Sequence, residues 1–152
     1  MIIVSACLAG IKCNWEGKSK PCQKVIELVK DGMAITVCPE QLGWLSTPRI
    51  PAEQIDRRVV TKEGKDVTSE FNKGALLALD VALKNKCNKA ILKSKSPSCG
   101  CGLVYDGTFS DKLIKGDGVF TKLLKENGIE VISEKDLWYF LTKEQKPFKL
   151  LS

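Results

Sequence analysis

Residues 95–102 read Lys95-Ser96-Pro97-Ser98-Cys99-Gly100-Cys101-Gly102 and follow a short apolar run, Ala90-Ile91-Leu92. Pro97 lacks an amide hydrogen and biases the residue before it away from helical angles, so the stretch cannot lie inside a helix or a sheet. Its two glycines allow positive φ and a close approach of the backbone to a bound group. The stretch is either a loop that holds a ligand through thiols and hydroxyls, or a tight turn around a buried cysteine.

Two further cysteines also follow short apolar runs. Cys7 comes after Ile2-Ile3-Val4, and Cys38 comes after Ala34-Ile35-Thr36-Val37. Each run is typical of a short strand buried on both faces, as is the run before Cys99. Taken singly, each cysteine is explained as a packed core thiol. Ligands bind at the carboxyl edge of open parallel sheets, so together the three cysteines predict a site at that edge.

The rest of the chain alternates between helical and strand patterns. Apolar residues at helical spacing predict helices over 21–31, 68–83 and 119–126, and from 133 onward with Leu137, Phe140 and Leu141 packing inward. Thr68 is the expected N-cap of the longest helix. Further strands are expected over 58–61, 89–93, 103–109 and 130–132. This order predicts one α/β domain over 1–152, with a small open parallel sheet of about four strands, helices on both faces and a Rossmann-like arrangement.

The composition limits the chemistry. The chain has no histidine, which excludes imidazole as a general acid, a general base or a zinc ligand. Seven cysteines without histidine favour an iron–sulfur cluster, an all-sulfur zinc site or redox thiols, and the odd count argues against a complete set of disulfides. The net charge of +6 comes from scattered basic residues without interleaved aromatics, so nucleic acid is not an expected partner.

The N-terminus lacks a basic segment before its apolar run, and Ser5 and Gly10 interrupt that run. We therefore expect neither a signal peptide nor a membrane span. Unpaired cysteines fit a reducing compartment, and we expect a cytoplasmic protein.

The other four cysteines are interpreted separately. Cys22 near a helix start and Cys87 at a helix end are expected to be structural. Cys13 and Cys101 are ambiguous, because their spacing from the nearest expected ligand matches neither a usual zinc ribbon nor the Cys-x-x-Cys redox pattern. Four thiolates on zinc would close the coordination shell, whereas three thiolates on a four-iron cluster would leave one iron open. Spacing alone does not decide between these two sites.

Polar groups near the expected thiols are candidates for proton transfer. Glu40 lies two residues after one of these thiols, and without histidine a carboxylate is the natural proton carrier. Ser96 and Ser98 offer hydroxyls, and Glu53 lies in a long loop together with Arg49. Each glutamate is otherwise explained as a solvated loop residue or as a partner of a helix N-cap. Arg49 suits either the binding of an anion or carbonyl, or an ion pair that tethers the loop.

Five motifs in order carry a family resemblance. They are Ser5-Ala6-Cys7-Leu8-Ala9-Gly10, Cys38-Pro39-Glu40, Thr47-Pro48-Arg49-Ile50-Pro51-Ala52-Glu53, Asp66-Val67-Thr68 with Phe71 and Gly74-Ala75, and Ser96-Pro97-Ser98-Cys99-Gly100. From the N-terminus to about Glu134, the chain resembles the short, single-domain form of the thiouracil desulfurase (desulfidase) family, formerly a domain of unknown function.

The resemblance implies a cofactor and a substrate. The cofactor would be a [4Fe–4S] cluster held by Cys7, Cys38 and Cys99, with one iron left open. The substrate would be a thiocarbonyl nucleobase such as 2-thiouracil, whose sulfur binds the open iron and is released as sulfide in a non-redox reaction. This sequence departs from the family at Trp15-Glu16-Gly17, where Tyr-Asp-Gly is common, and at Leu42-Gly43-Trp44-Leu45-Ser46, where Gly-Gly-Leu-Pro is common. If these loops line the pocket, the resemblance leaves the substrate open even where the chemistry is shared.

The resemblance also implies the catalytic residues. Glu40 and a serine of Ser96-Pro97-Ser98 match the family's catalytic positions. Glu40 would activate a water, and Ser96 or Ser98 would stabilise the developing charge or relay a proton. Two alternatives remain open. One is a sulfur-carrier or cluster-storage protein without turnover, and the other is a zinc-stabilised nucleic-acid-binding module with Cys13 or Cys101 as a fourth ligand.

Overall fold

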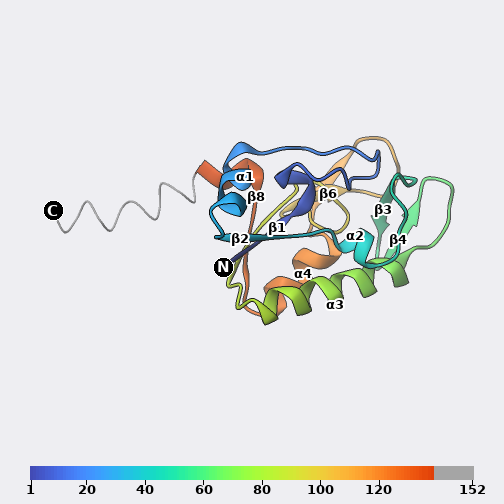
Figure 1. The fold of residues 1–152 in the computed structure, drawn as a ribbon. Coiled ribbons are helices and arrows are strands. Elements are labelled where there is room, and N and C mark those ends of the chain that lie inside the picture. The colour runs from blue at the N-terminus through green and yellow to red at the C-terminus, as the bar shows by residue number, and fades with distance from the viewer. Residues whose placement is uncertain (139–152) are drawn as a thin grey trace.

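A central parallel sheet organises the computed structural model, which describes residues 1–138 (Figure 1). Four strands form it in the spatial order β2-β1-β5-β8: β1 Ile2–Ser5, β2 Ala34–Val37, β5 Lys89–Leu92 and β8 Glu130–Ser133. In the register, Ile3 of β1 lies opposite Ile35 on one side and Ala90 on the other. This pairing confirms the predicted parallel sheet. Its strands are covered on both faces, which explains why they are apolar runs in the sequence.

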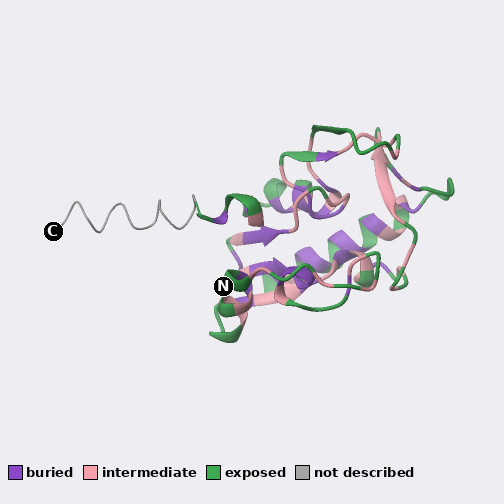
Figure 2. Cartoon of the chain, turned by 90° about the horizontal axis from the view of Figure 1, so that it is seen from above, coloured by how far each residue is buried: buried purple, intermediate pink, exposed green. Residues whose placement is uncertain are grey.

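Helices cover both faces of the sheet. The long helices are α1 Gln23–Lys30, α3 Thr68–Lys84 and α4 Val119–Glu126. Ile3 and Leu92 pack with Phe120 of α4 and the alanines of α3, whereas Val4 packs on the opposite face with Val25 of α1. Figure 2 shows the buried residues gathered on the strands and along the inner side of α3. Within residues 1–138, no helix is long and apolar enough to span a bilayer.

The strand order places the carboxyl end of β1 at a topological switch point. From β1 the chain passes to β2 on one side, and it later returns to β5 on the other. The loops that leave β1 and β5 therefore diverge and open a crevice, which is where open parallel sheets bind ligands. A short 3₁₀ turn, η1 Ala6–Ala9, leaves β1 and carries Cys7.

Two antiparallel hairpins lie outside the central sheet. One pairs β3 Ala52–Ile55 with β4 Arg58–Thr61, and the other pairs β6 Leu103–Tyr105 with β7 Leu113–Lys115. The strand expected over 58–61 is confirmed. The expectation of one strand and turn over 103–109 is only partly met, and β3 and β7 were not predicted. Every residue of β7 is exposed, so the strand has no alternation of buried apolar and exposed polar residues by which the sequence could have indicated it.

Two expected helix starts have different outcomes. The prediction that Thr68 is an N-cap is wrong, because Thr68 is the first residue of α3 and Asp66 Oδ1 accepts a hydrogen bond from its backbone nitrogen at 2.9 Å. At the start expected near residue 133, Ser133 caps the 3₁₀ turn η2 Glu134–Asp136, because its Oγ accepts a hydrogen bond from the backbone nitrogen of Lys135. Leu137 is buried as expected. Phe140 and Leu141 lie outside the described residues.

Two glycines let the short helix α2, Pro39–Leu42, lie directly against α3. A Cβ atom on Gly43 would lie 2.0 Å from the carbonyl oxygen of Glu70, and a Cβ atom on Gly74 would lie 1.8 Å from the carbonyl oxygen of Pro39. Backbone atoms cannot move aside as a flexible side chain does. This contact therefore fixes α2, which the sequence did not predict, at the end of β2.

Replacing Gly74 by alanine is expected to separate α2 from α3 and to lower the free energy of unfolding by about 1–3 kcal/mol, a usual effect of overpacking. Chemical denaturation measures the loss. Asn72→Ala, at an exposed position of α3, is the control and should stay within about 0.5 kcal/mol of the parent. A Gly74→Ala protein as stable as the parent would show that the helices do not need this contact.

Glu134 connects the end of β5 to the turn after β8. Its Oε2 accepts from the Ser94 backbone nitrogen at 2.8 Å, and its Oε1 accepts from Ser94 Oγ at 2.7 Å and from Lys93 Nζ at 3.3 Å. Burial raises the pKa of Glu134, but the hydrogen bonds from Ser94 and the charge of Lys93 outweigh it and lower that pKa below its ordinary value. The contribution to stability is therefore present above the ordinary pKa and is lost as the pH falls through the folded-state pKa.

Glu134→Gln is expected to lower the free energy of unfolding by about 1–2 kcal/mol at neutral pH, because it removes the charge from these hydrogen bonds. Urea denaturation at neutral pH and below about pH 4 should show the difference from the parent shrinking in acid. Glu130→Gln, at an exposed position of β8, is the matched control. A difference that is equal at both pH values would contradict a role for the carboxylate charge.

Candidate cofactor and substrate site

A cavity of about 540 Å³ opens among the loops that follow β1, β2 and β5. Three thiols line it, as the sequence predicted from their places after these strands: Cys7, Cys38 and Cys99. Glu40, Glu53 and Ser96 line the same cavity. The carboxyl edge of the sheet therefore gathers soft sulfur donors, carboxylates and a hydroxyl within one space.

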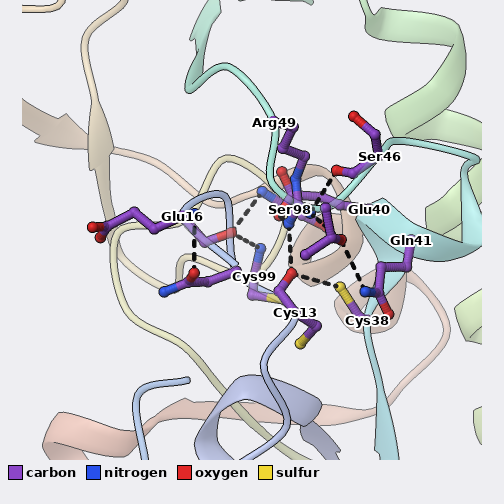
Figure 3. A network of polar contacts seen from close by, with 12 residues as sticks. Cys13, Glu16, Cys38, Glu40, Gln41, Ser46, Arg49, Ser98 and Cys99 are labelled. Atoms are coloured by element: carbon purple, nitrogen blue, oxygen red, sulfur yellow. Dashed lines mark hydrogen bonds and ion pairs between the residues drawn. The ribbon is translucent and has the colours of Figure 1, made fainter. Parts of the chain in front are cut away.

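A fourth thiol, Cys13, also lines the cavity and is buried. Cys38 Sγ donates a weak hydrogen bond to the carbonyl oxygen of Cys13 at 3.8 Å (Figure 3). A hydrogen bond with Cys38 lowers the pKa of Cys13, but the hydrogen bond with Cys7 and burial outweigh it and raise that pKa to about 11. The hydrogen bond with Cys13, together with burial, raises the pKa of Cys38, and burial raises the pKa of Cys99 to about 12.

The thiols and the space around them fit an iron–sulfur cluster. Thiolates are the usual ligands of such clusters, and a positively charged metal centre offsets the cost of deprotonating a buried thiol. Within residues 1–138, no three His, Cys, Asp or Glu side chains converge as a site for a single metal ion. The thiols instead surround a cavity that has room for a polynuclear group.

Three cysteines lie away from the cavity in the described part of the chain. Cys101 Sγ donates to the carbonyl oxygen of Val131 at 3.6 Å, and Cys87 is buried in the core beneath α3 and α4. Cys22 packs against the core on the α1 side of the sheet. Of the two cysteines that the sequence left ambiguous, Cys13 therefore joins the cavity and Cys101 does not.

Arg49 forms an ion pair with Glu40 at the cavity wall. Its Nη2 lies 3.0 Å from Glu40 Oε2, and the two side chains are only 6% and 19% exposed (Figure 3). The same Nη2 donates to the carbonyl oxygen of Cys13 at 2.9 Å. Arg49 therefore contacts a carboxylate and a backbone carbonyl at once, and its ion pair with Glu40 tethers the loop that carries it. This pair fixes one oxygen of the Glu40 carboxylate beside the thiols.

The two serines of the 95–102 loop are placed differently. Ser96 lines the cavity, and its Oγ accepts from the backbone nitrogens of Ser98 at 3.1 Å and Cys99 at 3.0 Å, which leaves its own hydrogen to donate. Ser98 is 1% exposed and is absent from the cavity lining. The reason is that the start of α4 covers it: a Cβ atom on Gly118 would lie 2.3 Å from the Ser98 carbonyl oxygen.

Aromatic side chains and lysines complete the wall of the cavity. Tyr105 and Phe109 line it, on the hairpin that the sequence only partly predicted. Of the two loops in which the sequence departs from the family, the one with Trp15 lines the cavity, whereas Trp44 of the other loop is 81% exposed and lies outside the lining. The lining is basic as well, with five lysines: Lys20, Lys62, Lys93, Lys95 and Lys135. The sequence did not indicate that these lysines lie together, because they come from four separate segments of the chain.

The fold and the cavity define a small α/β protein with a thiol-lined site at the carboxyl edge of a parallel sheet. Residues 2–136 match the 2-thiouracil desulfurase family, and the chain belongs to this family, which confirms the resemblance seen in the sequence. It is 44% identical over 147 residues to the uncharacterized protein YbbK of Bacillus subtilis (strain 168), an alignment that covers 90% of this chain and 97% of YbbK.

A solved structure is similar over nearly the whole chain. It is that of the [4Fe-4S]-dependent thiouracil desulfidase TudS, with a TM-score of 0.89 and 43% sequence identity. The match covers 95% of this chain and 97% of the TudS chain. The shared fold therefore includes the sheet edge where the cavity lies.

Proposed function

We propose that this protein is an iron–sulfur enzyme that removes the sulfur of a thiocarbonyl nucleobase such as 2-thiouracil. Water supplies the oxygen, so that the carbon–sulfur bond is replaced by a carbon–oxygen bond and the products are uracil and hydrogen sulfide, with no net oxidation or reduction. The observation that carries the proposal is the convergence of Cys7, Cys38 and Cys99 with Glu40 in one cavity. The similarity to TudS supports the same chemistry.

In this proposal, Cys7, Cys38 and Cys99 hold a [4Fe–4S] cluster. Cys7 lies in the turn after β1, Cys38 directly after β2 and Cys99 in the loop after β5, so each thiolate would be supplied by a segment that leaves a different strand of the sheet. When bound, a cluster with three protein ligands supplies an open iron that acts as a Lewis acid on the carbon–sulfur bond. Cys13, the fourth thiol of the cavity, lies outside this ligand set.

Glu40 is the general base of the proposed reaction. Arg49 binds its Oε2 at 3.0 Å and orients the carboxylate, and Oε1 takes a proton from the water that attacks the substrate carbon. The Ser96 hydroxyl donates a hydrogen bond to the charge that develops on the substrate. Glu40 then passes its proton to the departing sulfur. The second hydrogen of the water also moves to the sulfur as the carbonyl forms, which gives hydrogen sulfide.

The proposal is tested on protein purified without oxygen. Iron and acid-labile sulfide are measured first, and the protein is then incubated with 2-thiouracil while uracil and sulfide are quantified. We expect equal amounts of both products, in large excess over the protein. Bound iron without turnover would favour a cluster-storage or sulfur-carrier protein, and zinc in place of iron would favour a structural metal site.

A further inference from the structure

We propose that Glu53 is a positioning residue that holds an aromatic wall of the cavity and thereby sets its affinity for a flat heterocycle. The wall is formed by Tyr105 and Phe109, and the loop that carries Phe109 is residues 106–111, between β6 and β7. The inference deepens the proposed function and rests on it for the identity of the ligand.

Glu53 binds this loop through two backbone amides. It lies in the middle of β3, and its Oε1 accepts from the backbone nitrogens of Gly107 at 3.0 Å and Phe109 at 3.1 Å. The contact joins segments more than fifty residues apart, so no local sequence pattern determines it. A carboxylate that accepts two amide hydrogens forms charge-assisted hydrogen bonds, which are stronger than those of a neutral acceptor.

The loop also lies directly on β3. Gly107 has a φ of +93°, and a Cβ atom there would lie 2.4 Å from Ile55 Cγ1 and 2.7 Å from the Gln54 carbonyl oxygen. Phe109, with a φ of +54°, adopts a left-handed conformation that is uncommon for a residue with a side chain. The hydrogen bond from the Phe109 amide to Glu53 helps to hold this conformation, and with it the ring at the cavity.

A planar nucleobase suits this wall. Thiouracil and uracil present a flat π-face, and aromatic side chains bind such faces by stacking. Glu53 itself also lines the cavity, but its Oε1 is engaged by the two amides. In this inference Glu53 acts on the substrate through Phe109, whereas Glu40 acts on the attacking water.

Two substitutions of Glu53 separate positioning from acid–base chemistry. Glu53→Ala removes the acceptor, and we expect faster hydrogen exchange of the Gly107 and Phe109 amides, a KM for 2-thiouracil about 10-fold higher, and a kcat within about twofold of the parent. Glu53→Gln keeps a carbonyl oxygen that can accept both amides, and it should restore slow exchange and most of the affinity. Glu63→Ala, at an exposed turn outside the cavity lining, is the control.

Phe109→Ala tests the wall separately and covers the case in which Glu53→Ala does not fold. Loss of one stacking ring should raise KM and the Kd of uracil about 10- to 100-fold while the Gly107 amide stays protected. An equal fall of kcat in Glu53→Gln and Glu53→Ala would overturn the inference, because the carboxylate would then act in the chemistry. Unchanged exchange and KM in Glu53→Ala would overturn it too.

The same experiments distinguish this inference from the proposed function. If the parent protein neither binds uracil nor releases sulfide from 2-thiouracil, the proposed function is wrong and the ligand assigned to the wall falls with it. Hydrogen exchange is measured without substrate, so it still decides whether Glu53 holds the 106–111 loop. Slow exchange in the parent and fast exchange in Glu53→Ala would support the contact in either case.

Discussion

Cys38→Ser is expected to lose its iron–sulfur cluster, with iron and acid-labile sulfide falling below about a tenth of the parent value. A serine hydroxyl is a harder ligand than a thiol and is not ionised near neutral pH, so it is a poor replacement for a thiolate on iron. With three proposed ligands, loss of one leaves only two attachment points. The measurement is metal and sulfide analysis, with the visible absorption spectrum, after purification and reconstitution without oxygen.

The other cysteines provide matched controls for this result. Cys22→Ser and Cys87→Ser should retain the iron of the parent, because both thiols pack against the core away from the cavity. Cys13→Ser is the sharper comparison, since Cys13 lines the cavity beside Cys38. If Cys38→Ser kept the full iron content and Cys13→Ser lost it, the third ligand would be Cys13 and not Cys38.

The sheet was predictable because each of its strands is a contiguous run of residues with a recognisable pattern. Buried parallel strands are short apolar runs, and the runs at 2–4, 34–37 and 90–92, together with the strand expected over 130–132, match the four strands of the sheet described for residues 1–138. Helix α2 was harder to predict, because its position depends on a contact with the distant helix α3. Gly43 and Gly74 allow this contact between α2 and α3, but nothing in the residues around either glycine indicates that the two helices touch. The hairpins pair segments that are close in the sequence, but every residue of β7 is exposed, so no apolar alternation indicated that strand.

The site was predictable as a set of thiols at strand ends, but not as a cavity. Cys13 reaches it because the chain turns back after β1, and its backbone carbonyl is then held by Arg49. Ser98 has the same residue type and nearly the same place in the sequence as Ser96, yet the packing of α4 buries it. Burial by a distant element, as at Ser98, cannot be read from neighbouring residues.

Glu40→Gln separates the proposed chemistry from the cofactor. Glutamine has nearly the shape of glutamate, and its amide oxygen can still accept from Arg49, but it cannot take a proton from water. Iron content and binding of 2-thiouracil should therefore match the parent, while turnover falls by about 10²–10⁴, the usual contribution of a positioned general base. Sulfide release without oxygen measures the rate, with iron measured in the same samples.

The interpretation of Glu40→Gln depends on the buried Arg49. Its side chain is 6% exposed, so loss of the opposing charge also destabilises the loop, and circular dichroism is needed to show that the variant is folded at the assay temperature. Glu63→Gln changes a carboxylate at an exposed turn, outside the cavity lining, and should turn over like the parent. A folded Glu40→Gln protein with full iron and the parent rate would exclude Glu40 as the base. Glu16, a further carboxylate that lines the cavity, would then be the next residue to replace.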